Sequence, residues 1–213
     1  MYDAGTLPRN TSDSPTMKRV NAQRAIKPLT TDEPHLPGTV LRTSNPHVGV
    51  LVEHAERRLV TTLAIPEGTV IFRIEGHETA TPTKYSLQIG KDLHLDQRGA
   101  RDANDRVWRF YWRYMNHGCE PTTLIRDREV IAARDIAALE GVTFDYNTTE
   151  YDMAEPFRCH CGSAHCVGLV RGARHLTPQQ RARVEQRLPD YLRLTIAERP
   201  PRTQRHLTRS SAQ

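Results

Sequence analysis

The chain has 213 residues, enough for one domain of ordinary size with additional segments. Hydrophobic residues make up 37% of it, and no apolar run approaches the ~20 residues of a membrane span, so we expect no membrane partner. The net charge is +5, but the sequence contains no dense run of Lys and Arg. Nucleic acid is therefore not expected as a direct substrate.

Residues 1–45 are polar, are interrupted by prolines and show neither helical nor strand periodicity, so we expect a flexible leader. From Val48 onward, short β-branched runs separated by turns predict strands. The expected strands are residues 48–52, 59–65, 69–74, 85–89, 93–95, 129–133 and 142–144. Residues 96–106 are charged and predict a loop. Many short strands with close turns indicate a mainly β fold of several small sheets.

A helix is predicted near the end of the chain. Thr177 is a typical N-cap, Pro178 suits the first helical position, and Gln180 completes a capping box. Pro189 predicts a kink or a restart of the helix. Residues 200–213 are expected to be a disordered tail.

All four cysteines lie in two short segments. Cys119 stands alone, and forty residues later Cys159, Cys161 and Cys166 follow in a C-x-C-x4-C pattern. Four thiolates are the ligand set of a closed structural zinc site, and such a site would tie the C-terminal segment onto the Cys119 loop. Free thiols, disulfides and a nucleophilic Cys119 beside His117 are the alternatives. The beginning of the chain shows no signal-peptide pattern, so we expect a cytoplasmic protein, where disulfides are rare.

Four motifs, arriving in the same order, resemble those of SET-domain methyltransferases. The family patterns are I-P-x-G-x-x-I, R-F-x-N-H-S-C-x-P-N, I-x-A-x-R-x-I followed by G-E-E-L-T-F-D-Y, and the post-SET zinc motif C-x-C-G-x-x-x-C-x-G. The matching segments here are Ile65–Ile71, Arg113–Thr122, Ile131–Ile136 with Gly141–Tyr146, and Cys159–Gly168. The chain is therefore identified as a member of that family over about residues 46–172.

The chain departs from the family pattern at three positions. His47 stands where the first glycine of a G-x-G motif is usual, Gly118 where serine is usual, and Thr122 where asparagine is usual. No cysteine-rich pre-SET pattern is present in this sequence. The departures keep open the alternative of a catalytically inactive SET domain that acts as a binding module.

The resemblance implies a SET-type fold with a knot-like C-terminal segment, a post-SET zinc loop and a C-terminal helix. The expected organisation is a SET-like catalytic domain at 46–150, a post-SET zinc segment at 151–172 and a helical segment at 173–199. The sequence does not indicate an oligomeric state.

The implied activity is methyl transfer from S-adenosylmethionine to an amine, usually a lysine in a protein or peptide. Tyr146 aligns with the family's catalytic tyrosine, and Phe144 occupies the position that influences how many methyl groups are added. The residues expected to contact the cofactor are Gly49, Tyr85, Asn116 and His117. A small amine of a biosynthetic pathway is the alternative substrate.

Overall fold

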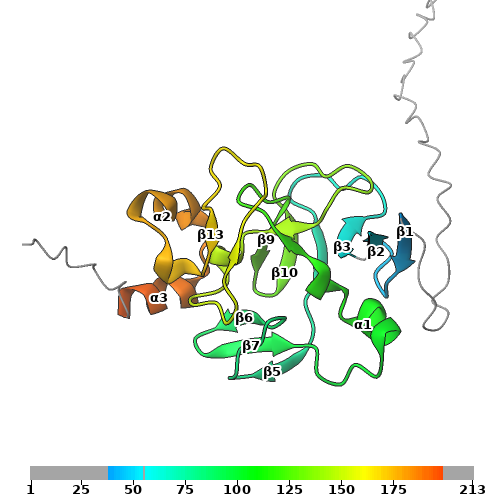
Figure 1. Cartoon of the computed structure of the whole chain (residues 1–213), viewed down its shortest axis with the longest axis horizontal. Helices are drawn as coiled ribbons and strands as arrows, with labels where there is room; N and C mark the ends of the chain where they lie inside the picture. Colours follow the sequence, from blue (N-terminus) through cyan, green and yellow to red (C-terminus); the bar gives the residue numbers. More distant parts are fainter. Residues whose placement is uncertain (1–37, 55, 199–213) are drawn as a thin grey trace, which may run out of the picture.

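The protein is described by a computed structural model that covers residues 38–54 and 56–198. In this part of the chain, short strands form five small sheets accompanied by a few short helices (Figure 1), which confirms the mainly β fold. Most of the expected leader and the expected tail at 200–213 lie outside the described residues. No helix in the described ranges is both long and apolar enough to cross a membrane.

Three of the sheets have three strands each. The first is antiparallel, in the order β1 (Thr39–Arg42), β2 (Val48–Glu53), β3 (Glu56–Thr61). The second has the order β4 (Val70–Arg73), β10 (Glu129–Ala132), β9 (Thr123–Arg126). The third has the order β5 (His77–Thr79), β7 (Leu93–Asp96), β6 (Leu87–Gly90), and its β6–β7 hairpin is the one that the sequence predicts.

Two pairs of two-residue strands complete the β structure. Strand β8 (Asn116–His117) runs parallel to β11 (Thr143–Phe144), so Asn116 lies beside Thr143 and His117 beside Phe144. Strand β12 (Phe157–Arg158) pairs with β13 (Leu169–Val170). The first pair joins two of the conspicuous sequence motifs. The knot-like threading of the C-terminal segment stays a prediction.

The helices are short. They are α1 (Ala103–Arg109), η1 (Tyr111–Tyr114), η2 (Tyr146–Thr148), η3 (Ala173–His175), α2 (Pro178–Val184), η4 (Glu185–Arg187) and α3 (Asp190–Glu198). The capping box of α2 is confirmed, because the Thr177 hydroxyl accepts from Gln180 N and the Gln180 side chain accepts from Thr177 N. The chain restarts as α3 directly after Pro189.

Two expectations differ from the structure. The expected leader at 1–45 includes strand β1, whose Val40 and Leu41 are buried against the neighbouring strand. A four-residue strand is too short to show a period of its own. The expected loop at 96–106 contains the start of helix α1, which Asp102 caps by accepting a hydrogen bond from Asp105 N. This helix has seven residues, and Val107 is its only buried hydrophobic residue. The sequence therefore shows no amphipathic pattern that would predict a helix here.

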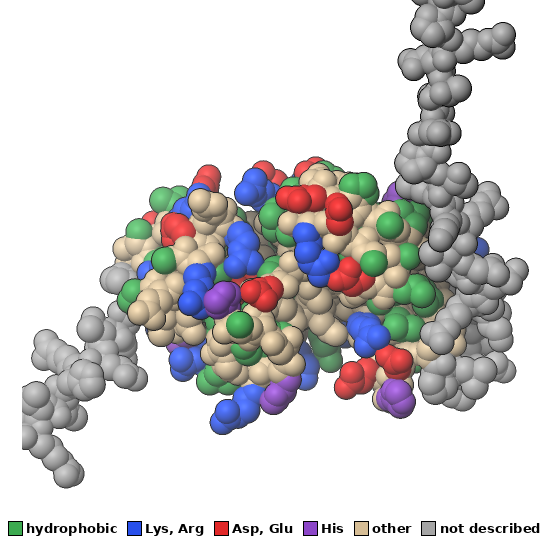
Figure 2. Space-filling view, turned by 90° about the horizontal axis from the view of Figure 1, so that it is seen from above, with side chains coloured by type: hydrophobic (Ala, Val, Ile, Leu, Met, Phe, Trp, Pro, Cys, Tyr) green, Lys and Arg blue, Asp and Glu red, His purple; other side chains and the backbone are tan. Residues whose placement is uncertain are grey.

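Two hydrophobic clusters organise the packing. The larger one lies between the sheets and includes Leu59, Ile74 and Leu95. The second lies beneath the C-terminal helices, with Leu192 packed in a group that includes Tyr151. Burying each such side chain contributes about 1.5–3 kcal/mol. Figure 2 shows acidic and basic side chains interspersed on the face drawn there, rather than a field of one sign.

A close passage of the backbone fixes the segment that follows η2. Gly172 has φ +102°, and a Cβ atom there would lie 2.6 Å from the carbonyl oxygen of Tyr151. Its N–H donates to Oδ1 of Asn147, a fully buried side chain. A main-chain atom cannot rotate away, so the position requires glycine.

We therefore expect Gly172→Ala to destabilise the protein by at least about 3 kcal/mol, since it combines backbone strain with a main-chain clash. Gly99→Ala is the matched control, because Gly99 also has a positive φ of +88° but no atom near its missing Cβ. That control should cost only about 1–2 kcal/mol. Urea unfolding monitored by fluorescence measures both, and equal losses would contradict the close passage.

Candidate functional site

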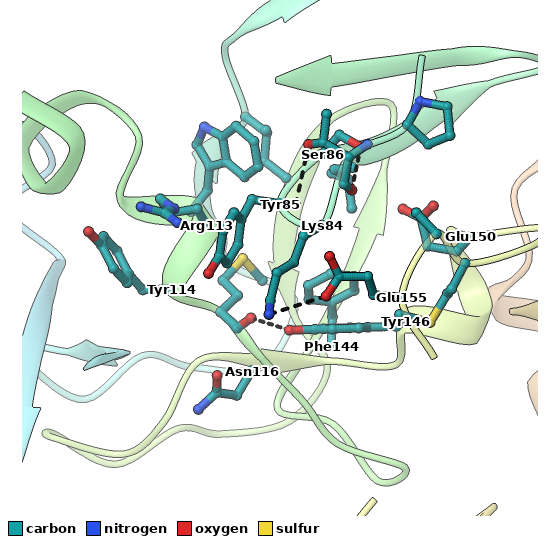
Figure 3. A pocket seen from close by; sticks show the side chains of 18 of the residues that line it. Lys84, Tyr85, Ser86, Arg113, Tyr114, Asn116, Phe144, Tyr146, Glu150 and Glu155 are labelled. Atoms are coloured by element: carbon teal, nitrogen blue, oxygen red, sulfur yellow. Dashed lines mark hydrogen bonds and ion pairs between the residues drawn. The ribbon is translucent and has the colours of Figure 1, made fainter. Parts of the chain in front are cut away.

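A cavity of about 720 Å³ opens beside the paired strands β8 and β11 (Figure 3). Four of the residues singled out in the sequence lie on its wall, namely Tyr85, Asn116, Phe144 and Tyr146. The parallel pairing places Asn116 and Phe144 on adjacent strands, and Tyr146 opens helix η2 two residues later. The Asp145 side chain caps that helix by accepting from Asn147 N, which holds the backbone of Tyr146 in place.

The hydroxyl of Tyr146 has a defined direction. It donates a hydrogen bond to the main-chain carbonyl of Met115 at 2.7 Å. Its ring packs 4.6 Å from that of Phe144 and meets Phe157 edge-on at 5.8 Å, measured between centroids. Burial raises the pKa of Tyr146, so the phenol stays neutral. The hydroxyl proton of Tyr146 is used in the hydrogen bond to the Met115 carbonyl, whereas the lone pairs of the hydroxyl oxygen can accept hydrogen bonds from a ligand.

Two polar groups on the wall lack partners within the described chain. The amide of Asn116 is exposed and forms no hydrogen bond to any described residue. The guanidinium of Arg113 stacks 4.1 Å from the ring centroid of Tyr85 and 5.1 Å from that of Tyr114. Its Nε atom is buried without a hydrogen-bond partner among the described residues. The exposed Asn116 amide can therefore receive a polar ligand without losing an existing bond, and Arg113 borders the same cavity.

His117 and Gly49 do not line the cavity. The imidazole of His117 is 2% exposed; its Nδ1 accepts from Tyr146 N, and its Nε2 lies 3.2 Å from Sγ of Cys119. Burial lowers the pKa of His117 to about 4, so the ring is neutral and carries its proton on Nε2, toward the sulfur. Gly49 packs within β2, where a Cβ atom would approach Val40 to 2.5 Å. The cofactor role of both residues stays a prediction.

Several charged residues on the wall were not singled out by sequence reasoning. They are Arg57, Lys84, Arg106, Glu150 and Glu155. Lys84 and Glu155 form an ion pair at 3.2 Å. Glu150 is buried, which raises its pKa to about 7, and it accepts a hydrogen bond from Gln88 N. These residues belong to segments without a recognisable motif. The only sequence signal that could have placed one of them near the cavity is the short distance of four residues between Tyr146 and Glu150.

The four cysteines come together as one cluster. The sulfur atoms of Cys119, Cys159, Cys161 and Cys166 all lie within 4.8 Å of one another, and no disulfide joins them. Four thiolates about 2.3 Å from a central ion are separated by about 3.8 Å along each edge of a tetrahedron. The Cys119 and Cys159 sulfurs are 4.0 Å apart, and Val167 N lies 3.4 Å from the Cys119 sulfur, to which it donates. The donor set and its spacing fit a tetrahedral metal ion.

Two of the three departures from the family pattern, Gly118 and Thr122, are compatible with this geometry. Thr122, in place of asparagine, donates its hydroxyl to Gly141 O at 2.9 Å and accepts from Thr143 N at 2.8 Å. A Cβ atom on Gly118 would lie 3.2 Å from the Thr143 hydroxyl, a tight contact that glycine avoids. Both residues thus support the alignment of β8 with the segment that leads to Tyr146.

Comparison with known proteins agrees with the sequence motifs. Residues 56–147 match the protein family described as the SET domain. Over 119 residues the chain is 32% identical to Methyltransferase flvH of Aspergillus flavus, covering 54% of this chain and 61% of that protein. Over 69 residues it is 36% identical to an H3 lysine-36 specific histone-lysine N-methyltransferase of Aspergillus oryzae, covering 28% of this chain and 7% of that protein.

A solved structure of KRYPTONITE in complex with mCHG DNA and SAH is also similar, with a TM-score of 0.44 and 17% identity over 64% of this chain and 30% of that one. The match spans less than two thirds of the length of each curated relative described above. The matched segment 56–147 contains Asn116, Phe144 and Tyr146, whereas Gly49 precedes it. Residues 56–147 thus match the SET domain, and the chain is similar in sequence to methyltransferases.

Proposed function

We propose that this protein is an S-adenosylmethionine-dependent methyltransferase that methylates the amine of a lysine side chain in a protein or peptide. The observation that carries the proposal is the Tyr146 hydroxyl, held 2.7 Å from the Met115 carbonyl in the wall of the cavity. The names of the two curated relatives support methyl transfer, and the Aspergillus oryzae protein is described as a histone-lysine N-methyltransferase.

The cavity suits a cofactor of this size. Ligand pockets for small molecules typically measure about 300–1,000 Å³, and this one measures about 720 Å³. When bound, the cofactor supplies a methyl group on a sulfonium, which is already a good leaving group. The unpartnered amide of Asn116 and the guanidinium of Arg113 are the groups on the wall that would hold it. The remaining task of the protein is to position the amine.

The aromatic wall favours a reactive amine. A lysine has an ordinary pKa of about 10.4, and only its neutral form can attack. The rings of Phe144, Tyr146 and Phe157 surround that part of the cavity with apolar surface, which disfavours the ammonium form. The oxygen atoms of Tyr146 and of the Met115 carbonyl can accept N–H and weak C–H hydrogen bonds, and so orient the reacting groups.

We infer that the four cysteines hold one structural zinc ion. The inference is supported by four sulfurs within 4.8 Å of one another, which is the full ligand set of a closed site. His117 links this cluster to the cavity, since it contacts Cys119 on one side and the backbone of Tyr146 on the other. Loss of the ion should therefore disturb the cavity as well as the C-terminal segment.

The first prediction tests the reaction. Incubation of the protein with methyl-labelled cofactor and a cell extract should transfer label to proteins or peptides. Tyr146→Phe removes the hydroxyl but keeps the ring, so the rate should fall at least about 10²-fold. Cofactor affinity, measured by calorimetry, should change little, because the ring still packs against Phe144. A Tyr146→Phe protein at full rate would remove Tyr146 from the mechanism.

The same assay separates the alternatives. Label that enters small metabolites instead of proteins or peptides would identify a small amine as the substrate. A protein that neither binds the cofactor nor transfers label would contradict the enzyme and support an inactive binding module. Tyr114→Phe serves as a matched control, because Tyr114 lines the same cavity but no hydrogen bond of its hydroxyl to another described residue is present.

The second prediction concerns the number of methyl groups. Phe144 has no hydroxyl and lies beside the Tyr146 ring, which leaves room for an amine to turn after the first transfer. We expect the wild-type protein to add more than one methyl group to a nitrogen. Phe144→Tyr adds a hydroxyl that can hold a water in this space and should shift the products toward monomethylation. Mass spectrometry of the product measures the shift, and an unchanged product distribution would contradict it.

The third prediction concerns the metal. Elemental analysis should find one zinc per chain, and Cys166→Ser should lower the metal content, the stability and the affinity for the cofactor together. His165→Ala is the matched control, because the exposed His165 precedes a ligand without belonging to the cluster. Unchanged cofactor affinity in a zinc-free Cys166→Ser protein would contradict the coupling through His117.

A further inference from the structure

Lys84 occupies an unusual position on the cavity wall. It belongs to the loop between β5 and β6, and it lines the same cavity as Tyr146 and Phe144. In Figure 3 its side chain extends from that loop toward the side of the cavity where Tyr146 lies. A lysine amine is thus present at the place where the proposed reaction needs one.

The rest of the chain offers few competing lysines. The sequence contains four, at positions 18, 27, 84 and 91. Of the two that the structure describes, Lys91 does not line the cavity and pairs instead with Glu198. Lys84 is therefore the described lysine that combines access to solvent with a position beside the aromatic wall.

An ion pair holds Lys84 across the cavity. Its Nζ atom lies 3.2 Å from a carboxylate oxygen of Glu155, which belongs to the segment between Tyr146 and the cysteine-rich loop. The same nitrogen lies 5.7 Å from the ring centroid of Tyr85. Both side chains of the pair are more than half exposed, so water can screen the bond and the lysine can be released by rotation of its own side chain.

We propose that Lys84 is a methylation site and that the protein methylates it in its own cavity. This inference rests on the proposed function. The Lys84 ammonium first leaves Glu155 and gives its proton to water. The lone pair of Nζ then forms the new N–C bond with the methyl group, while the S–C bond breaks and its electron pair remains on sulfur. The products are methylated Lys84 and S-adenosylhomocysteine.

Glu155 should restrain this reaction. Its hydrogen bond and its negative charge raise the pKa of Lys84, which favours the unreactive ammonium. Glu155→Gln removes the charge while keeping the shape, and it should accelerate methylation of Lys84 several-fold. In the cofactor-free protein, the same substitution should make Lys84 react faster with an amine-acylating reagent, whereas Lys91 serves as the internal reference. This second measurement does not depend on turnover.

The decisive experiment is peptide mapping by mass spectrometry. Purified full-length protein is analysed as isolated and again after incubation with S-adenosylmethionine. We expect added methyl groups on the peptide that contains Lys84, and none there in Lys84→Arg or Tyr146→Phe. Lys91→Arg should leave the modification of Lys84 unchanged. The rate per chain should not depend on protein concentration, because the reacting lysine belongs to the same cavity.

The outcomes separate this inference from the proposed function. If substrates in an extract are labelled but Lys84 is not, self-methylation is wrong and the methyltransferase stands. If the protein neither binds the cofactor nor labels any substrate, the proposed function itself fails. Methyl groups found on another lysine in preference to Lys84, or a rate per chain that rises with protein concentration, would overturn the assignment of Lys84 in its own cavity.

Discussion

The parallel pairing of β8 with β11 is the constraint on which the rest of the site depends. Each strand contributes only two residues, yet the pairing brings Asn116 next to Thr143, which lies 27 positions later in the chain. Gly118 N extends it by donating to Phe144 O at 3.1 Å. Because each strand places one residue on the cavity wall, this short ladder brings Asn116 and Phe144 to the same wall as Tyr146, which follows Phe144 by two residues. Without it, the intervening chain would separate Asn116 from Phe144 and Tyr146.

A buried histidine extends this constraint to the cysteine cluster. His117 follows Asn116 in β8, but its side chain turns away from the cavity and lies between Tyr146 N and the sulfur of Cys119. Burial lowers the pKa of His117 to about 4, so the ring keeps one donor and one acceptor throughout the physiological range. The cavity and the cluster are thereby joined through a single neutral side chain.

The opposite wall of the cavity has a different character. It is contributed partly by the β5–β6 loop and partly by the segment that leads to the cysteines, and the exposed pair of Lys84 with Glu155 is the contact between them. An exposed ion pair contributes at most about 1 kcal/mol, whereas the buried aromatic wall is fixed by packing. One side of the cavity is therefore rigid, and the other is held by a bond that can open at little cost.

The sequence by itself determined the features that depend on local pattern or on motif. It predicted the β6–β7 hairpin, the capping box at Thr177 and the four cysteines as one group, and it singled out Asn116 and Tyr146, which line one cavity. Alternating side chains and fixed spacings are visible in a linear chain because they repeat at the period of the backbone. The short strand β1 and helix α1 were missed because neither is long enough to show such a period.

Only the tertiary structure decided which residues face one another. It turned the His117 side chain toward Cys119, kept Gly49 within the packing of β2, and brought Lys84 to Glu155 across 71 positions of the chain. No local pattern encodes these contacts, because each results from strand pairing and loop packing between distant segments. The cysteine group and the motif residues were therefore determined by the sequence, whereas the shape of the cavity and the charges on its second wall were decided by the fold.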